Sequence, residues 1–238
     1  MPRLTIAPAG DRALAIKVGD TISPEINLTV RNLAIALEKQ QIPAVLDIVP
    51  AYCSILINYD PLISSLNDLT IKIKELGKAI NDSVVESPRT IEIPTVYGGN
   101  YGPELSYVAQ FNGLTELEVI DIHSSNDYLV YAMGFTPGFT YLGGLSDRIV
   151  TPRLQTPRTE IPAGSVGIAE QQTGIYPIES PGGWQLIGRT PVKLFDPTKN
   201  PPVIVEPGDY IRFTPISSEE YERIASENNQ LEFEQTNQ

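Results

Sequence analysis

The chain has 238 residues, of which 29 are acidic and 17 basic, so its formal net charge at pH 7 is −12. Such a surface repels nucleic acid and anionic membranes, and neither is expected as a partner. Hydrophobic residues make up 41% of the chain, which is enough to bury a core and excludes wholesale disorder.

Cysteine usage and the N-terminal sequence predict a cytoplasmic protein. Cys53 is the single cysteine, so no internal disulfide can form, which suits a reducing compartment. The N-terminal stretch lacks the basic segment, apolar core and cleavage site of a secretion signal. No apolar run approaches the roughly 20 residues needed to span a bilayer.

Composition divides the chain near residue 86. Residues 1–85 hold 3 of the 18 glycines and 6 of the 21 prolines, whereas residues 86–218 hold 15 of each. Because glycine and proline punctuate short strands and turns, the first part is expected to be α/β and the second mostly β. Residues 219–238 carry six acids and one arginine, which predicts a solvated helix end that fades into disorder. We therefore expect an N-terminal α/β domain over residues 1–86, a β-barrel domain over residues 87–218, and an acidic C-terminal tail.

The N-terminal part is predicted to fold as β-α-β-β-α, a small sheet backed by two helices. Residues 13–18 have the pattern of a strand. Ser23 then supplies an N-cap, and the next two residues supply a first-turn proline and an acid at the positive end of a helix. Two strand-like segments, residues 45–49 and 54–59, precede a second amphipathic helix over residues 62–80.

The second part is predicted to open with a strand over residues 90–96 and to continue with two short helices. The second of these helices has a capping box formed by Thr115 and Glu118. Short apolar runs between glycine and proline turns then follow, and they predict a compact barrel, because closing a sheet on itself removes its exposed edges. The runs are residues 128–135, 165–169, 184–187, 192–195, 203–205 and 210–213.

The side chains exclude several kinds of catalytic site. His123 is the single histidine, whereas a zinc site built from histidine and cysteine needs three or four ligands. We expect no metal site, although an all-carboxylate magnesium site stays open. A Ser-His-Asp triad would depend on His123, and we interpret this residue instead as a helix-end side chain bonded to backbone. No Walker A motif is present, so any ATP used in the reaction is expected to bind another chain.

Three glycine-rich segments carry the candidate ligand contacts. The first, residues 133–145, reads MGFTPGFTYLGGL and places Phe135, Phe139 and Tyr141 around a rigid Pro-Gly turn. These aromatic side chains either line a small-molecule pocket or partner surface, or they fill the core at a barrel corner. Their spacing does not decide between the two.

The other two segments are also open to two interpretations each. In residues 156–170, Arg158 either forks onto a ligand carboxylate or pairs with Glu160 on the same strand face. Residues 172–191 are rich in Gly, Ser, Thr, Gln and aromatics that are able to converge on a polar neutral ligand. Alternatively, the SPGGW stretch is a tight hairpin with Trp184 packed inward.

In these segments the chain resembles the B-subunit family of 5-oxoprolinase, which includes the sporulation kinase inhibitor of the Kip system and allophanate-hydrolase-subunit-1-like proteins. The matching stretches are YAMGFTPGFTYLGGL, TPRTEIPAGSVGIAEQQTGIYPIESPGGWQLIGRTP, and the later FDP and PGD. GDRAL, ISPEIN and the PAY…NYDPL pattern match in the N-terminal part, so the resemblance covers nearly the whole chain. One departure is that Thr136 and Thr140 stand where the family usually carries apolar residues.

The resemblance implies a cyclophilin-like β-barrel after the α/β domain, and partner subunits of the C and A types. It implies a cytoplasmic complex that opens the lactam of 5-oxo-L-proline to L-glutamate with ATP hydrolysis. This chain would not bind ATP by itself and would be inactive alone. No catalytic role follows for any single residue. The candidate substrate contacts that the resemblance carries over are His123, Phe135, Phe139, Arg158, Gln172, Tyr176, Ser180, Gly183, Trp184 and Arg189.

The same resemblance supports an alternative function, in which the chain inhibits a sensor histidine kinase by covering its helical dimerisation domain. A third function, prolyl isomerisation, rests on the barrel's resemblance to cyclophilin and is disfavoured, because a fold does not carry an activity. We therefore predict a subunit of a hydrolase that acts on cyclic amides, with kinase inhibition as the alternative.

Overall fold

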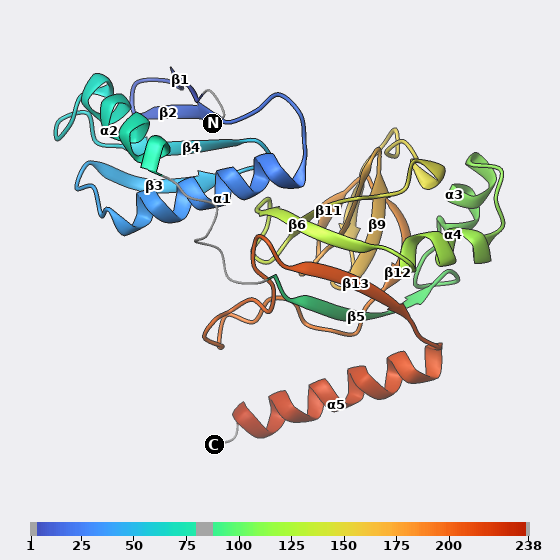
Figure 1. The fold of residues 1–238 in the computed structure, drawn as a ribbon. Coiled ribbons are helices and arrows are strands. Elements are labelled where there is room, and N and C mark those ends of the chain that lie inside the picture. The colour runs from blue at the N-terminus through green and yellow to red at the C-terminus, as the bar shows by residue number, and fades with distance from the viewer. Residues whose placement is uncertain (1–3, 80–87, 237–238) are drawn as a thin grey trace. The chain divides into compact units, whose positions relative to one another are not determined.

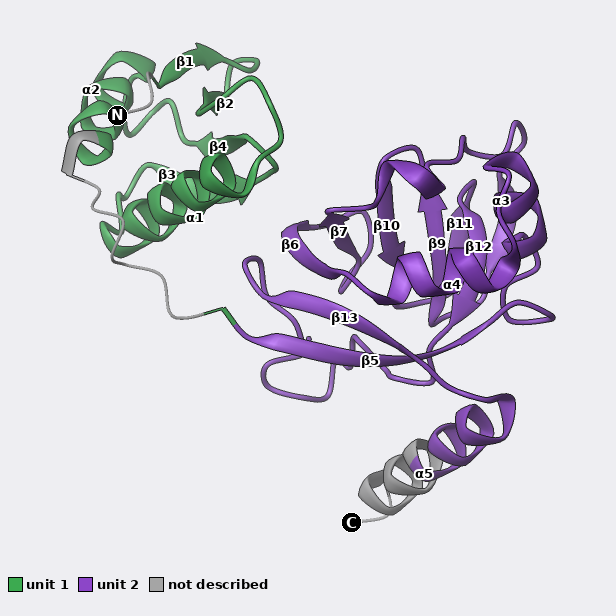
Figure 2. Cartoon of the chain, turned by 45° about the vertical axis from the view of Figure 1, so that its right-hand side comes forward, with its two compact units in different colours: residues 1–88 green, residues 89–238 purple. Residues whose placement is uncertain are grey.

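A computed structural model describes residues 4–79 and 88–236 of the chain. The chain divides into two compact units, residues 1–88 and residues 89–238 (Figure 2). Each unit has a hydrophobic core of its own, so each is built from layers that bury their own apolar residues.

Unit 1 is a four-stranded antiparallel sheet with two helices (Figure 1). Its elements are β1 (Thr5–Pro8), β2 (Ala13–Lys17), α1 (Pro24–Lys39), β3 (Val45–Pro50), β4 (Ser54–Tyr59) and α2 (Leu66–Ala79). The strand order is β1-β2-β4-β3, so β1 and β3 are the edge strands. Both edge strands end in a proline, and the pairing of β3 with β4 shifts register between Val45 and Asp47.

Alternation along the strands decides which face of this sheet is buried. Leu14 and Ile16 on β2, and Ile55 and Ile57 on β4, are fully buried, because every second strand residue points to the same face. These side chains share one core with the apolar residues of α1 and α2, whereas Leu56 on the opposite face is 38% exposed. Both helices therefore cover the same face of the sheet.

The sequence sets the start of α1 as predicted. The Ser23 hydroxyl accepts a hydrogen bond from the Ile26 amide at 3.3 Å, Pro24 occupies the first turn, and Glu25 follows it. The hydroxyl satisfies an amide that has no partner within the helix. The carboxylate of Glu25 lies at the positive end of the helix dipole.

The predicted start of the second helix was wrong. The helix begins at Leu66, and Leu62 is 95% exposed instead of forming part of a buried stripe. The Asp60 carboxylate accepts a hydrogen bond from the Leu62 amide at 3.0 Å, and Ser65 accepts one from the Asp68 amide at 3.2 Å. The first bond holds a turn and the second caps the helix, so the helix starts after Ser65.

One strand of unit 1 was not predicted. β1 pairs with β2 from Thr5 opposite Lys17 to Pro8 opposite Leu14. Four residues that include a proline are too few to show a strand pattern. The element order is therefore β-β-α-β-β-α instead of β-α-β-β-α. The predicted end of the second helix at residue 80 lies outside the described residues.

Unit 2 contains a closed barrel of strands, which confirms the predicted mixed α/β class with a barrel (Figure 2). The elements are β5 (Thr90–Tyr97), α3 (Leu105–Phe111), α4 (Glu116–Ser124), β6 (Asp127–Met133), β7 (Thr140–Gly143), η1 (Asp147–Ile149), β8 (Arg158–Ile161), β9 (Ser165–Ala169), β10 (Gln172–Ile175), β11 (Ser180–Gly182), β12 (Gln185–Arg189), β13 (Tyr210–Pro215) and α5 (Ser218–Thr236). The barrel order is β10-β7-β6-β13-β5-β12-β9, and β9 pairs with β10 to close it. β5 and β13 are parallel, and β8 and β11 form a separate two-stranded sheet.

One apolar core fills the barrel. Ile93, Val130, Leu142, Val166 and Ile187 come from five different strands and are fully buried. Helices α3 and α4 add residues to the same core. The two short helices are therefore part of the barrel's packing.

The predicted strands at residues 192–195 and 203–205 were wrong. Among the described residues they are joined by a single isolated bridge, between Phe195 and Val203. The intervening segment contains several prolines, which cannot donate hydrogen bonds to a strand ladder.

The segment that follows β6 also differs from the prediction. The strand expected over residues 128–135 ends at Met133, because Phe135 has a left-handed φ of 69° that breaks the extended geometry. Strands β7, β10 and β11 were not predicted, since four residues or fewer do not show an alternating pattern.

The start of α4 and the extent of α5 can be compared with the predictions. The capping box of α4 is confirmed: the Glu118 amide donates to the Thr115 hydroxyl at 3.2 Å, and the Thr115 amide donates to the Glu118 carboxylate at 2.8 Å. The acidic C-terminal segment, expected to fade into disorder, forms α5 through Thr236.

Gly102 is required by a close approach of two backbone segments. An added Cβ would overlap the carbonyl group of Ile187 and lie 2.6 Å from the amide nitrogen of Gly188. We expect Gly102→Ala to lower the free energy of unfolding by about 3 kcal/mol, because backbone atoms cannot give way as a side chain can. Urea unfolding followed by circular dichroism measures this change.

Gly134→Ala is the matched control for this substitution. The added Cβ would meet its nearest atom at 3.9 Å, on the Tyr141 ring. We expect the control to change the free energy of unfolding by less than about 1 kcal/mol. Equal unfolding midpoints for the two variants would show that the approach at Gly102 is not tight.

Candidate functional site

An aromatic cluster lies on the outer face of the barrel. Ala169 and Leu186 belong to this cluster, whereas their chain neighbours Ile168 and Ile187 belong to the barrel core. Since neighbouring strand residues point to opposite faces, the cluster faces outward from β9 and β12. Ile161 of β8 joins it, so the β8–β11 sheet packs against it. The buried members are Phe139, Ile161, Ala169, Tyr176, Trp184 and Leu186, and Tyr141 packs against them.

Phe139 is the central ring of the aromatic cluster. It makes edge-to-face contacts with Tyr141, Tyr176 and Trp184, with centroid distances of 5.1, 5.4 and 5.6 Å. Phe135 extends the cluster outward: its ring lies 5.5 Å from that of Phe139, and the residue is 62% exposed. Phe139 therefore fills a core, as one interpretation of residues 133–145 expected, whereas Phe135 faces solvent and its role as a ligand or partner contact stays a prediction.

Tyr176 and Trp184 are almost completely buried. Burial raises the pKa of Tyr176 to about 12, so its hydroxyl stays protonated at neutral pH. A Cβ on Gly182 would overlap this hydroxyl, which explains a glycine in the SPGGW stretch. Trp184 packs inward as the second interpretation of this stretch expected, but the tight hairpin was wrong, because β11 pairs with β8 whereas β12 pairs with β5 and β9.

Arg158 forms an ion pair with Glu104, so the expected alternative of a pair with Glu160 was wrong. Its Nη1 also donates to the carbonyl oxygen of Trp184 at 3.2 Å. The other carboxylate oxygen of Glu104 accepts a hydrogen bond from the Leu186 amide at 2.9 Å. The charge of Arg158 is therefore already neutralised by the protein.

Sequence reasoning missed Glu104, which sits just before α3. An acid at the start of a helix is ordinary, because it faces the positive end of the helix dipole. Nothing local in the sequence indicates that its partner is an arginine 54 residues away.

Arg153 was also missed, and it lies over the Trp184 ring. Its guanidinium carbon is 6.0 Å from the ring centroid, which is within the range of a cation–π contact. Arg153 is exposed, and no carboxylate of the described residues forms an ion pair with it. The sequence did hold a signal, because the triplet Thr-Pro-Arg that ends at Arg153 is repeated and ends again at Arg158.

His123 lies in the barrel core, fully buried. Its Nδ1 is 2.8 Å from the Tyr97 hydroxyl and its Nε2 is 2.8 Å from the Thr173 hydroxyl. The expectation that His123 bonds to backbone was wrong, since both partners are side-chain hydroxyls.

The partners of His123 fix its tautomer. The Thr173 hydroxyl donates its proton to the carbonyl oxygen of Gly167 at 3.0 Å. It must therefore accept from Nε2–H, which leaves Nδ1 to accept from the Tyr97 hydroxyl. A neutral ring satisfies every partner, and burial lowers the pKa of His123 to about 3.

Three other candidates bond locally or lie at strand ends. The Ser180 hydroxyl donates to the carbonyl oxygen of Ile178 at 3.3 Å, and Arg189 Nε donates to that of Ala163 at 2.8 Å. Gln172 is the first residue of β10 and is half-buried. These contacts assign no ligand role to the three side chains.

The ten candidates thus fall into groups. The structure places His123 in the barrel core, and Gln172 and Arg189 at the ends of strands. Gly183 stands next to Trp184 in the chain. The candidates that the aromatic cluster brings together, by ring contact or through the Trp184 carbonyl, are Phe135, Phe139, Tyr176, Trp184 and Arg158.

Comparison with known proteins identifies the family. A family model described as "Carboxyltransferase domain, subdomain C and D" matches residues 4–205. The chain is 42% identical over 237 residues to the B subunit of 5-oxoprolinase from Bacillus subtilis (strain 168), with 95% of this chain and 99% of the relative covered. The chain belongs to the B-subunit family of 5-oxoprolinase.

Solved structures agree with the fold of this family member. A conserved uncharacterized protein from Pyrococcus horikoshii is 51% identical, with 91% of this chain and 100% of that chain covered and a TM-score of 0.55. The K. lactis urea amidolyase gives a TM-score of 0.79 at 22% identity, with 95% of this chain but 16% of that chain covered. The second likeness concerns the fold alone.

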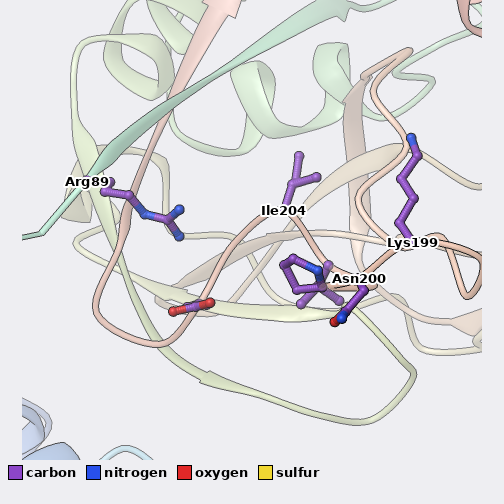
Figure 3. A pocket seen from close by; sticks show the side chains of 7 residues that line it. Arg89, Lys199, Asn200 and Ile204 are labelled. Carbon is purple, nitrogen blue, oxygen red and sulfur yellow. The ribbon is translucent and has the colours of Figure 1, made fainter.

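Unit 2 of this family member also contains a cavity of about 470 Å³, away from the residues of the aromatic cluster (Figure 3). Arg89 on its rim forms two hydrogen bonds with Asp209, at 3.1 and 2.6 Å, and Lys199 pairs with Asp196 at 3.6 Å. Since both cations already have carboxylate partners, we prefer the aromatic cluster as the functional site. The cavity is lined by Arg89, Lys199, Asn200, Pro201, Val203, Ile204 and Glu206.

Within residues 4–79 and 88–236, no three His, Cys, Asp or Glu side chains gather closely enough to hold a metal ion. No helix of the described residues is both long enough and apolar enough to cross a membrane.

Burial of His123 should make stability depend on pH. Its pKa is about 3 in the folded chain against an ordinary value of 6.5, so between these values the unfolded chain binds a proton that the folded chain does not. The stability that the neutral ring contributes is present above pH 6.5 and is lost as pH falls toward 3. Between about pH 7 and about pH 5, we expect a loss of about 2 kcal/mol from this residue. Urea unfolding at each pH measures it.

His123→Gln provides the control, because glutamine offers a donor and an acceptor but does not titrate. The variant is expected to be less stable at neutral pH and to lose less stability on acidification. Parallel stability–pH curves for the native chain and the variant would show that His123 is not the titrating group.

Proposed function

We propose that the chain is the B subunit of an ATP-dependent 5-oxoprolinase. In that role it contributes, with subunits A and C, to opening the ring of 5-oxo-L-proline to L-glutamate. The observation that carries this proposal is the 42% identity to a relative named as the B subunit of 5-oxoprolinase, over 95% of this chain and 99% of the relative. Because the match spans both compact units, it concerns the whole chain and not one common module.

The domain assignment forms part of the proposal. Residues 1–86 are the N-terminal α/β domain, residues 87–218 the cyclophilin-like barrel domain, and residues 219–238 the acidic C-terminal tail. The division of the chain into units after residue 88 supports the first boundary. The closure of the barrel supports the second domain.

The chemistry of a lactam explains why such a protein works with partners. An amide carbonyl is a poor electrophile, and phosphorylation of its oxygen makes it a better one. The sequence has no Walker A motif, so we assign ATP to the partner subunits. The part left to this chain is to bind and orient the ring.

The exposed members of the site are the ones able to touch the lactam. Phe135 and Arg153 are exposed, whereas Phe139, Tyr176 and Trp184 are buried. An aromatic ring packs well against a flat five-membered ring. A guanidinium forms strong charge-assisted hydrogen bonds with a carboxylate such as that of 5-oxoproline. We therefore assign ligand contact to Phe135 and Arg153, and their support to the three buried rings.

Ligand contact by the remaining candidate residues stays a prediction. Ser180 and Gly183 lie beside the aromatic cluster in sequence and are retained as polar contacts. Ligand contact by His123 or Arg189 would require a side chain that already bonds to another group of the protein. Gln172 lies at the start of β10.

Partners and compartment follow from the same proposal. Phe135 is 62% exposed next to a buried aromatic core, and large apolar side chains of this kind anchor protein interfaces. We assign this surface to contact with the C subunit, which would complete the site. The complex is cytoplasmic in this proposal, and the isolated chain is inactive.

Reconstitution tests the function directly. The chain is purified with its cognate subunits A and C, and glutamate formation from 5-oxoproline is followed with ATP present. Omission of this chain is expected to abolish the reaction, and undiminished activity without it would refute the proposal. Kinase inhibition stays a prediction, and sensor kinase autophosphorylation measured with and without the chain tests that alternative.

Arg153→Gln should weaken recognition of the substrate carboxylate. In the reconstituted complex we expect KM for 5-oxoproline to rise about ten-fold or more with kcat changed little, because the lost contact is made in ground state and transition state alike. The ratio of kcat/KM between 5-oxoproline and 2-pyrrolidinone, which lacks the carboxylate, should fall toward one.

Arg148→Gln is the matched control. Arg148 is another exposed arginine of unit 2, and no carboxylate of the described residues forms an ion pair with it. Its replacement should leave both kinetic constants unchanged. An equal rise of KM in the two variants would point to overall charge and not to a specific contact.

A further inference from the structure

Glu104 occupies the N-cap position of α3, but its side chain does not cap the helix. Its carboxylate bonds instead to groups outside the helix. It accepts a hydrogen bond from the Leu186 amide at 2.9 Å, while the Glu104 amide donates to the Leu186 carbonyl oxygen at 2.9 Å. One residue thus binds both peptide groups of Leu186 in β12.

The other carboxylate oxygen of Glu104 pairs with Arg158, the first residue of β8. The same guanidinium donates to the Trp184 carbonyl oxygen at 3.2 Å. The side chains of Arg158 and Glu104 are 27% and 16% exposed. Because solvent reaches them poorly, removal of one charge would leave the other without compensation.

These bonds act where the strand ladder is irregular. The pairing of β12 with β9 shifts register between Leu186 and Gly188. A shift of this kind bends a strand and changes the direction in which its side chains point. The bonds from Glu104 and Arg158 hold β12 just before this shift, at Leu186 and at Trp184.

We propose that Glu104 is a positioning residue for the ligand surface built on Trp184. It touches no ligand. Its carboxylate holds Arg158 and the start of β12, and so fixes the Trp184 ring between Phe139 and Arg153. The kinetic consequence rests on the proposed function, whereas the placement of Trp184 can be tested on the isolated full-length chain.

Trp184 is the single tryptophan of the chain, so its fluorescence reports on this site alone. Glu104→Gln keeps an oxygen that can accept from the Leu186 amide but removes the charge that Arg158 requires. We expect unchanged far-UV circular dichroism, a shift of the emission maximum to longer wavelength, and stronger quenching by acrylamide. In the reconstituted complex, KM for 5-oxoproline should rise about five-fold or more, and kcat should change less than about two-fold.

Two further variants make the result specific. Arg158→Gln should give the same emission change, and the double variant should not add to it, because both substitutions break one linkage. Asp127→Asn is the control: it breaks the exposed pair of Asp127 with Arg212 in the same unit and should leave the emission unchanged. If Glu104→Gln alters the circular dichroism, Arg158→Gln carries the test.

Native emission and quenching in both Glu104→Gln and Arg158→Gln would overturn the assignment. So would a lower KM in Glu104→Gln, because it would mean that the released Arg158 binds the ligand itself. A native complex that does not open 5-oxoproline would refute the proposed function alone, and the fluorescence results would still decide whether Glu104 positions Trp184.

Discussion

The pairing of β5 along both of its edges is the constraint on which the closed barrel of unit 2 depends. This strand pairs in parallel with β13 from Thr90 opposite Tyr210 to Thr95 opposite Pro215, and it pairs antiparallel with β12 at its other edge. An open edge would leave backbone groups that need water or another chain as partners. The loop after β5 contains Gly102 and Glu104. The position of β5 therefore also helps to place the Glu104 carboxylate, which accepts a hydrogen bond from Leu186 of β12.

The closed sheet separates two environments on the same strands. Residues of β9, β10 and β12 that point inward contribute to the apolar core. The core also holds a neutral histidine, which bonds to Thr173 of β10. A charged imidazolium there would cost far more than its hydroxyl neighbours could return. The outward residues build the aromatic cluster, and the charged groups Glu104, Arg153 and Arg158 are confined to that side. The ion pair of Arg158 with Glu104 and the guanidinium of Arg153 therefore lie beside the aromatic cluster, whereas the polar groups around His123 lie in the core.

Local sequence signals predicted part of this arrangement. The cap at Ser23, the capping box of α4 and the strand Ser165–Ala169 depend on residues within a few positions of one another, so they could be read directly. The glycine-rich segments also indicated where the aromatic cluster would form. The pairing of Arg158 with Glu104, and the stacking of Arg153 on Trp184, could not be predicted in this way. Both contacts form between segments that are far apart in sequence. The residues next to an arginine in the sequence do not indicate which distant side chain it will contact.

The two edge strands of the sheet in unit 1 affect how readily this sheet can pair with a strand of another chain. Pro8 and Pro50 end β1 and β3, and neither has an N–H to offer to an incoming strand. The register shift near Asp47 further disturbs the regular spacing along the β3 edge. An incoming strand from a second copy of the chain would therefore lose one donor at the end of each edge, and the short regular stretch that is left makes unit 1 a poorer template for the growth of fibres.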